Sequence, residues 1–239
     1  MPTNTSRVHV GDIPYGEAIY TCNKEGVIAL TFDDGPWEYT EHLLDILKEY
    51  DAKATFFVVG RNMGKGAIND PDTPWPPIIR RMIDEGHQIG SHTWSHQKLT
   101  EINPEQFQKQ MLFNEIALAD LLGYFPTYMR PPHSMSNAQT DKWLADLGYH
   151  VTYFDLNTLG YENEGADLIQ NSKDIWDERV EDLDPGTGSV LEIEHDPLYH
   201  TVYNLTEYML DSLFRNEFKS VTVGECLGDP KENWYRRVY

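Results

Sequence analysis

The sequence has few basic residues and no long apolar run, and both absences narrow the range of functions. Its 19 Lys and Arg residues stand against 39 Asp and Glu residues, which gives a formal net charge of −20. A chain this acidic repels nucleic acids and anionic membrane surfaces, so we expect neither as a partner. No run of about 18 apolar residues is present, so no membrane span is predicted. A neutral substrate carries no such electrostatic penalty.

Cysteine is also scarce: only Cys22 and Cys226 are present, near opposite ends of the chain. A disulfide between them would close a loop of about 200 residues and stabilise the fold by roughly 4–5 kcal/mol. The alternative is two buried free thiols. Residues 1–4 lack the basic and apolar regions of a signal peptide, so the chain is either not secreted or a mature form. Glycosylation triplets begin at Asn4 and Asn204, and we expect a secreted or cell-wall protein.

Apolar and β-branched runs alternate with segments of helical period along the whole chain. The predicted strands are 27–33, 54–60, 87–92, 128–131, 150–156, 189–195 and 220–226. The predicted helices are 40–50, 76–86, 104–123, 137–148, 165–180 and 203–216. This alternation is typical of parallel β/α units. Since no linker or repeat divides the chain, we predict one domain over residues 1–239. Its fold is expected to be a barrel-like α/β domain of about seven parallel strands, with 1–26 as an irregular lead-in or small hairpin.

Two short motifs carry most of the chemistry. Residues 31–36 read Thr-Phe-Asp-Asp-Gly-Pro, which places Asp33 and Asp34 where an apolar run ends in a turn. Residues 92–96 read His-Thr-Trp-Ser-His, which spaces His92 and His96 four residues apart. One carboxylate and two imidazoles are a typical ligand set for Zn²⁺ with an open position, although Co²⁺ and Ni²⁺ have overlapping preferences. The second carboxylate is then available as a base, which indicates a metal-dependent hydrolase.

The barrel prediction brings these motifs together. In β/α barrels the active site gathers at the carboxyl ends of the strands. The Asp33 motif, His92, Arg130 and His195 each fall at or just after the end of a predicted strand. We therefore expect them on one rim of the barrel.

The two motifs, followed by Arg-Pro-Pro at 130–132, resemble those of polysaccharide deacetylases with a NodB-type domain, carbohydrate esterase family four. The resemblance is greatest to fungal chitin deacetylases and covers about residues 26–226. It implies a distorted barrel, one divalent metal that is usually zinc, and hydrolysis of N-acetyl groups on chitin or its oligomers. The expected partner is therefore a sugar polymer, and we expect a monomer.

The resemblance also implies a role for each matching residue. Asp33 corresponds to the catalytic base, and Arg130 to the arginine that orients it. His195 corresponds to the general acid, and Ile193 to the residue lining the pocket for the acetyl methyl group. The implied metal ligands are Asp34, His92 and His96.

Two positions depart from the family pattern. His133 stands where the family has Tyr, but the implied role is a backbone N–H donated to the oxyanion, which a side-chain change need not remove. Asn157 stands where the family has an acid that tunes the catalytic histidine, and it supplies no charge. Asp155 is the alternative for that role, and the sequence does not decide between them.

Aromatic residues near the motifs are candidates for stacking on sugar rings: Trp37, Tyr39, Trp75, Trp94 and Tyr161. Three other functions stay open. The same machinery serves an O-deacetylase acting on acetylated xylan. A non-catalytic carbohydrate-binding relative would be expected to lack the base or a ligand. A glycosidase with two carboxylates ranks last, because the His-x-x-x-His segment has no role in that chemistry.

Overall fold

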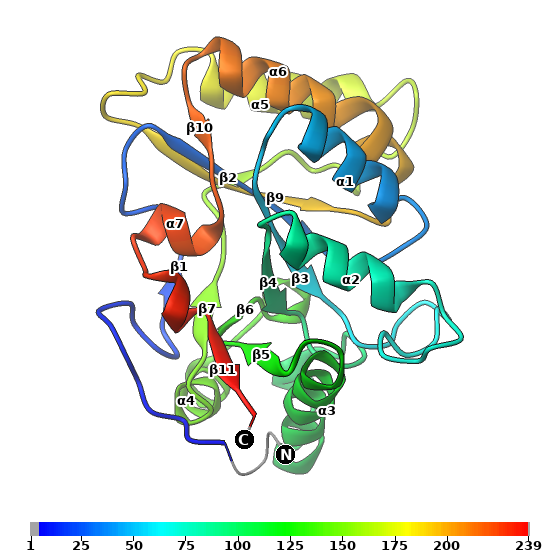
Figure 1. Ribbon diagram of the computed structural model, residues 1–239. Coiled ribbons are helices and arrows are strands. Elements are labelled where there is room, and N and C mark those ends of the chain that lie inside the picture. Colours follow the sequence, from blue (N-terminus) through cyan, green and yellow to red (C-terminus); the bar gives the residue numbers. More distant parts are fainter. Residues whose placement is uncertain (1–4, 239) are drawn as a thin grey trace.

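Nine parallel strands form the main sheet of the computed structural model, which describes residues 5–238 (Figure 1). Eight of them follow the order β1-β7-β6-β4-β3-β2-β9-β8. The ninth, β10, pairs with the first two residues of β2, before the part of β2 that pairs with β3. The strands are β1 (Ala18–Ile19), β2 (Val27–Asp33), β3 (Ala54–Val58), β4 (Gln88–Ser91), β6 (Tyr128–Met129), β7 (His150–Thr152), β8 (Leu156–Asn157), β9 (Ser189–His195) and β10 (Lys219–Ser220).

The sheet curls into a half-barrel, with β1 and β8 as its two ends. This confirms the predicted distorted barrel of parallel strands. The predicted number of strands, seven, is too low for two reasons. Strands β1 and β10 contain only two residues each, too few to be recognised from the sequence, and the segment 150–156 is divided between two short strands. The lead-in is not a hairpin, since β1 pairs in parallel with β7.

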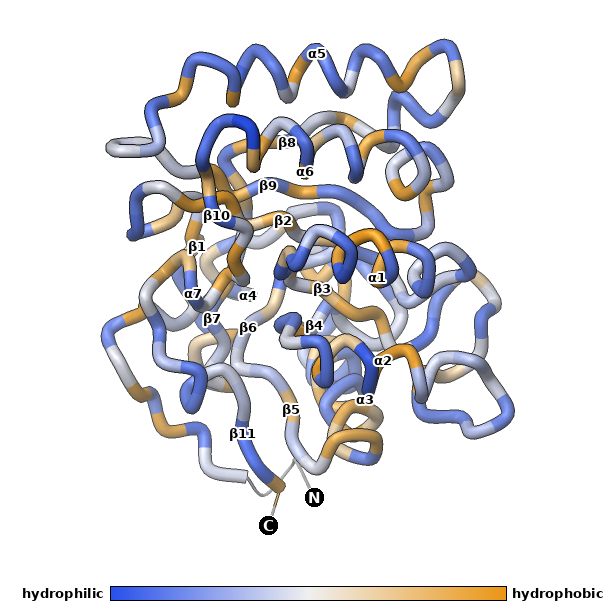
Figure 2. The backbone as a smooth tube through the Cα atoms, turned by 45° about the horizontal axis from the view of Figure 1, so that its top comes forward, coloured by the Kyte–Doolittle hydropathy of each residue, from blue (hydrophilic) through white to orange (hydrophobic). Residues whose placement is uncertain are grey.

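Helices pack around the curled sheet, most of them on its outer face (Figures 1 and 2). They are α1 (Thr40–Glu49), α2 (Trp75–Asp84), α3 (Pro104–Leu122), α4 (Ala138–Asp146), α5 (Ile169–Val180), α6 (Thr206–Arg215) and α7 (Val223–Leu227). Single turns are η2 (Leu99–Glu101), η3 (Pro132–Ser134), η5 (Lys231–Asn233) and the π-helical turn η4 (Thr201–Leu205). Within residues 5–238 no helix combines the length and apolarity that a membrane span requires.

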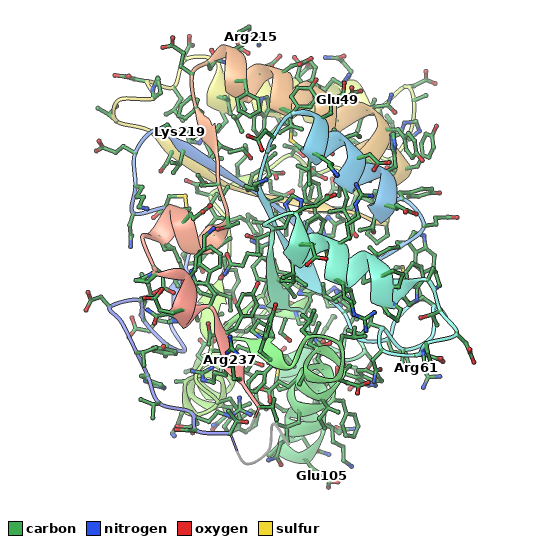
Figure 3. All side chains as sticks on the ribbon, viewed as in Figure 1. Glu49, Arg61, Glu105, Arg215, Lys219 and Arg237 are labelled. Carbon is green, nitrogen blue, oxygen red and sulfur yellow. A yellow bond between two sulfur atoms is a disulfide. The ribbon has the colours of Figure 1, made fainter. Side chains whose placement is uncertain are left out.

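Strand β2 packs against apolar side chains on both of its faces. Its alternate residues face opposite sides of the sheet, as in any strand. Leu30 and Phe32 pack outward with Leu43 and Leu47 of α1, while Ala29 packs inside the curl. Both faces are therefore apolar, which explains the uninterrupted hydrophobic run in the sequence. Charged side chains project from the surface instead, as for Glu49, Arg61, Glu105, Arg215, Lys219 and Arg237 (Figure 3).

The predicted strand 220–226 is wrong, because most of it forms helix α7. The Thr222 side chain accepts from the Glu225 N–H and the Glu225 side chain accepts from the Thr222 N–H, a capping box that starts a helix. Gly228 ends α7 in the left-handed conformation. A further two-stranded antiparallel sheet, β5 (Tyr124–Pro126) with β11 (Tyr235–Arg237), was not predicted.

A disulfide joins Cys22, just before β2, to Cys226 in α7. It fixes the lead-in segment to the C-terminal part of the chain. Of the two glycosylation triplets, the one at Asn4 begins outside the described residues, and Asn204 is exposed on η4.

Candidate metal and catalytic site

The site lies at the carboxyl ends of β2, β4, β6 and β9, where several residues after the strands have unusual backbone conformations. Five non-glycine residues there have positive φ: Asp34 (77°), Thr93 (71°), His96 (58°), His133 (59°) and Ser134 (51°). Such conformations are costly, most of all for a β-branched residue such as Thr93. Strain of this kind clusters at functional sites, where the surrounding structure holds it in place.

Asp34, His92 and His96 form a group that suits a divalent cation. One ligand atom from each lies within 4.8 Å of the others. Asp34 Oδ1 is 3.4 Å from His92 Nε2 and 3.0 Å from His96 Nε2. Yet this buried oxygen makes no hydrogen bond to any of residues 5–238. A carboxylate oxygen and two imidazole nitrogens that converge without bonding to one another fit a metal ion.

The orientation of the His92 ring is set by a backbone carbonyl in the loop that follows β6. Its Nδ1 lies 2.7 Å from the carbonyl oxygen of Arg130, so Nδ1 must carry the proton and donate it. The lone pair of the neutral ring is then on Nε2, which faces Asp34. Metal-binding histidines are typically oriented in this way.

The charges in this group are mutually stabilising. Burial disfavours the charged form of Asp34, but His92 and His96 outweigh it and hold the pKa of this carboxyl well below its usual range. Burial likewise opposes the charging of His92, while Asp33 and Asp34 raise the pKa of its ring. Asp34 is therefore ionised at neutral pH, as a metal ligand must be.

Asp33, the neighbouring carboxylate, points to a different partner. Its Oδ1 accepts a hydrogen bond of 2.7 Å from Arg130 Nη1. Asp33 Oδ2 lies 3.7 Å from His92 Nε2. The side chain is 2% exposed, and Arg130 beneath it is fully buried. The two adjacent carboxylates thus have different partners: Asp34 faces the two imidazoles, and Asp33 accepts from the guanidinium of Arg130.

A cleft of about 540 Å³ opens above these residues. Its lining includes Asp33, Asp34, His92, His96, His133, Asn157, Tyr161, Ile193 and His195, which the sequence singled out. Met63, Ser134, Phe154, Pro197 and Leu198 also line it. Ser134 ends the turn η3 and the other four come from loops; none belongs to a motif, so only the fold reveals them.

His195, at the end of β9, lines the cleft beside Tyr161. Its ring meets Tyr161 edge to face at 5.6 Å. His195 Nδ1 is buried and has no hydrogen-bond partner among the described residues. His133 lies on the other side of the metal group, with its ring 4.7 Å from that of His96.

The two residues considered for tuning His195 are engaged elsewhere. Asn157 accepts from the N–H of Leu159 and approaches Tyr161 Oη at 3.5 Å. Asp155 lies between β7 and β8 and accepts from the N–H of Leu191 at 2.7 Å. Neither makes the hydrogen bond to His195 that the sequence analysis considered, so that role finds no support within residues 5–238.

Of the five aromatic residues expected to contact sugar, four do not line the cleft: Trp37, Tyr39, Trp75 and Trp94. Trp94 packs against the outer core and occupies the space where a side chain at Gly60 would go, 2.2 Å from an added Cβ. Trp37 stacks on Trp75 with ring centroids 6.3 Å apart. Trp94 and Trp37 both pack against neighbouring side chains and stay partly exposed, so a contact of either with sugar remains a prediction; Tyr161 does line the cleft.

Comparison with known proteins agrees with this geometry. A sequence model of the family described as polysaccharide deacetylase matches residues 20–152. A chitin deacetylase of Colletotrichum lindemuthianum is 39% identical over 235 residues, 98% of this chain and 92% of that protein. The chain belongs to the polysaccharide deacetylase family. A second relative, a chitin deacetylase of Pestalotiopsis sp, is 39% identical over 224 residues, 94% of this chain and 71% of that protein.

A solved structure extends the family likeness to the whole fold. The chitin deacetylase from the fungal pathogen Colletotrichum lindemuthianum superposes with a TM-score of 0.90 at 38% identity. The match covers 95% of this chain and 98% of that chain. The polysaccharide deacetylase model itself ends at residue 152, before His195, so the likeness over β9 rests on these longer matches.

Proposed function

We propose that this protein is a metal-dependent hydrolase that removes N-acetyl groups from chitin or chitooligosaccharides and releases acetate. The observation that carries the proposal is the division of the adjacent carboxylates. Asp34 joins two imidazoles in a ready ligand set, while Asp33 stays on Arg130 and faces the same cleft. The chitin deacetylases among the relatives, at 39% identity, support the reaction and the substrate.

We assign Asp34, His92 and His96 as ligands of one divalent ion. One carboxylate and two imidazoles favour Zn²⁺, with Co²⁺ as the alternative. Bound there, the ion supplies Lewis acidity towards the acetyl carbonyl and lowers the pKa of a water molecule towards about 7.

Asp33 acts as the general base in this proposal. As water attacks the acetyl carbonyl, Asp33 accepts its proton, and a general base typically contributes about 10²–10⁴-fold. Arg130 holds Asp33 Oδ1 at 2.7 Å, which leaves Oδ2 free to take the proton. This arrangement orients one oxygen and fixes the carboxylate in the cleft.

His195 acts as the general acid on the other side of the reacting carbon. It donates a proton to the departing amine nitrogen, because an amine anion is a very poor leaving group. The His133 N–H is assigned to the developing oxyanion, and loss of one such donor typically costs about 10²–10³-fold in rate. Ile193, which is buried in the cleft floor, is assigned to the acetyl methyl group.

The charge of the protein supports a neutral polysaccharide. At a net charge of −20, anionic polymers are repelled. O-deacetylation of xylan is the second candidate, since the same residues would hydrolyse an ester. A non-catalytic binding role is disfavoured because the base and the complete ligand set are present in one cleft.

We also propose that residues 1–239 form one domain with its core over 26–226, active as a monomer outside the cell. The main sheet supports this extent, since it draws β1 from one end of the chain and β10 from the other. The disulfide supports an extracellular or cell-wall location, because such bonds persist in oxidising compartments.

The test is to incubate the protein with chitooligosaccharides and with acetylxylan, with and without chelator, and to measure acetate and chain length. We expect acetate from the N-acetyl substrate, no chain shortening, and loss of activity on metal removal. Acetate release that persists after complete metal removal would contradict the proposal. Faster acetate release from acetylxylan would show that acetylated xylan, rather than chitin, is the preferred substrate.

A further inference from the structure

Four rings form a cluster on the surface beside the cleft, which we call the aromatic stack: Tyr39, His42, Tyr199 and Tyr203. Tyr203 lies between two rings, with centroids 4.3 Å from His42 and 4.4 Å from Tyr199, both nearly parallel to it. Tyr39 meets Tyr199 and Tyr203 edge to face at 5.6 and 5.9 Å. The rings come from two segments far apart in the chain, residues 39–42 and 199–203.

The aromatic stack is not part of the core. Tyr199 is 46% exposed and Tyr203 is 36% exposed, so a large apolar area faces water. Tyr203 belongs to η4, a π-helical turn. Such turns are rare in proteins, and those that occur are often at functional sites. Exposed aromatic surface and an unusual helical turn at one place point to binding rather than to packing alone.

The aromatic stack continues the wall of the cleft. Pro197 and Leu198 line the cleft, and Tyr199 is the next residue. Thr40 donates a hydrogen bond to Asp196, which ties the loop before α1 to the loop after β9. The turn η4 packs against α1, and the ends of α1 and α6 that meet these loops lie on the same side of the molecule (Figure 1). A chain that leaves the cleft past Leu198 therefore meets these rings.

We propose that the aromatic stack is an outer subsite for the substrate, binding sugar units of the polysaccharide beyond the one being deacetylated. This inference rests on the proposed function. Sugar rings present flat C–H faces that pack on aromatic rings. Both faces of Tyr203 are covered by His42 and Tyr199, so the exposed Tyr199 at the end of the stack offers such a surface. The neighbouring acids Glu38 and Glu164 are exposed, so the subsite suits neutral N-acetylglucosamine units and repels anionic polymers.

The experiment compares substrates of two lengths. Acetate release is measured for the chitin dimer, which occupies only the cleft, and for the hexamer, which also reaches the outer subsite. In Tyr199→Ala we expect kcat/KM for the hexamer to fall by roughly three- to tenfold relative to the dimer, the size of one aromatic contact. The loss should appear in KM, since the reacting groups are untouched.

Two further variants make the comparison specific. Tyr199→Phe keeps the ring and should keep the wild-type ratio of hexamer to dimer. Phe214→Ala removes an aromatic residue of similar exposure, 41%, that stacks on Tyr50 away from the cleft, and should also keep the ratio. If Tyr199→Ala melts early, Tyr199→Leu retains apolar packing without the ring face and should show the same loss.

The outcomes separate the two proposals. No acetate from either length with the wild-type protein would contradict the proposed function. Full wild-type activity with an unchanged ratio in Tyr199→Ala and Tyr199→Leu would overturn the outer subsite alone. An equal loss in Phe214→Ala would likewise overturn it, because the effect would then be general to surface aromatics.

Discussion

Arg130 is the buried residue on which the geometry of the site most depends. Its guanidinium donates to Asp33 Oδ1 and Thr31 Oγ1, both at 2.7 Å, and to the carbonyl oxygens of Thr152 at 3.2 Å and Tyr153 at 2.8 Å. Two of these groups belong to β2, and the other two lie at the end of β7 and just after it, so Arg130 links two strands of the curled sheet. Replacing Arg130 by Met, which has similar length and no charge, removes all four bonds at once.

The cost of Arg130→Met follows from what it leaves behind. Asp33 is 2% exposed, so its carboxylate would be a buried charge without its cation. Breaking a buried pair in this way typically costs about 3–5 kcal/mol, a large part of a total stability of about 5–15 kcal/mol. At about 2–4 °C per kcal/mol, the melting temperature should fall by roughly 6–20 °C. Arg130→Lys keeps the charge but cannot reach all four acceptors. Its melting temperature should therefore lie between those of the wild type and Arg130→Met.

Thermal unfolding of a double-mutant cycle measures the pair itself. The four proteins are wild type, Arg130→Met, Asp33→Asn and the double variant. Asp33→Asn removes the buried charge, so Arg130→Met should cost less in that background, with a coupling of about 0.5–3 kcal/mol. A melting temperature of Arg130→Met within about 2 °C of wild type, or no coupling, would refute the reasoning.

Two further predictions concern stability. Burial first, and then the charge of Glu194, raise the pKa of Glu192 well above its usual range. The folded state therefore holds this proton more tightly, so the contribution of Glu192 to stability is fully present below about pH 4.3 and is lost as the pH rises through the folded pKa. Glu192→Gln should remove this loss and melt above wild type at pH 7–8 but not at pH 4; parallel melting profiles would count against it. Serine at both Cys22 and Cys226 should lower the unfolding free energy in urea by about 4–5 kcal/mol, and an unchanged urea midpoint would show that the disulfide contributes little.

The elements that the sequence predicted well carry their own local signals. Strands 27–33 and 189–195 match β2 and β9 to the residue; the first is a mostly apolar run and the second alternates apolar and acidic residues from Leu191 to Glu194. Helix α3 begins at Pro104 after the Asn103 cap and ends before Gly123, as expected. Helix α7 was missed because the apolar residues of 220–226 were given more weight than its capping box.

The remainder depends on partners distant in the chain. Strands β1, β5 and β11 contain two or three residues, too few for any periodicity, and form only because another segment pairs with them. At the site, the motif residues were predictable because each follows a strand. Met63 and Leu198 were not, because apolar loop residues bear no chemical signal before the fold places them in the cleft.

The central claim is that adjacent carboxylates have separate tasks, and one paired measurement tests it: bound metal and acetate release on the same samples of Asp33→Asn and Asp34→Asn. Asp33→Asn should keep the wild-type metal content and lose acetate release by about 10²–10⁴-fold. Asp34→Asn should lose both metal and activity, because one of its three ligands becomes a neutral amide. Loss of metal in Asp33→Asn with retention in Asp34→Asn would contradict the account.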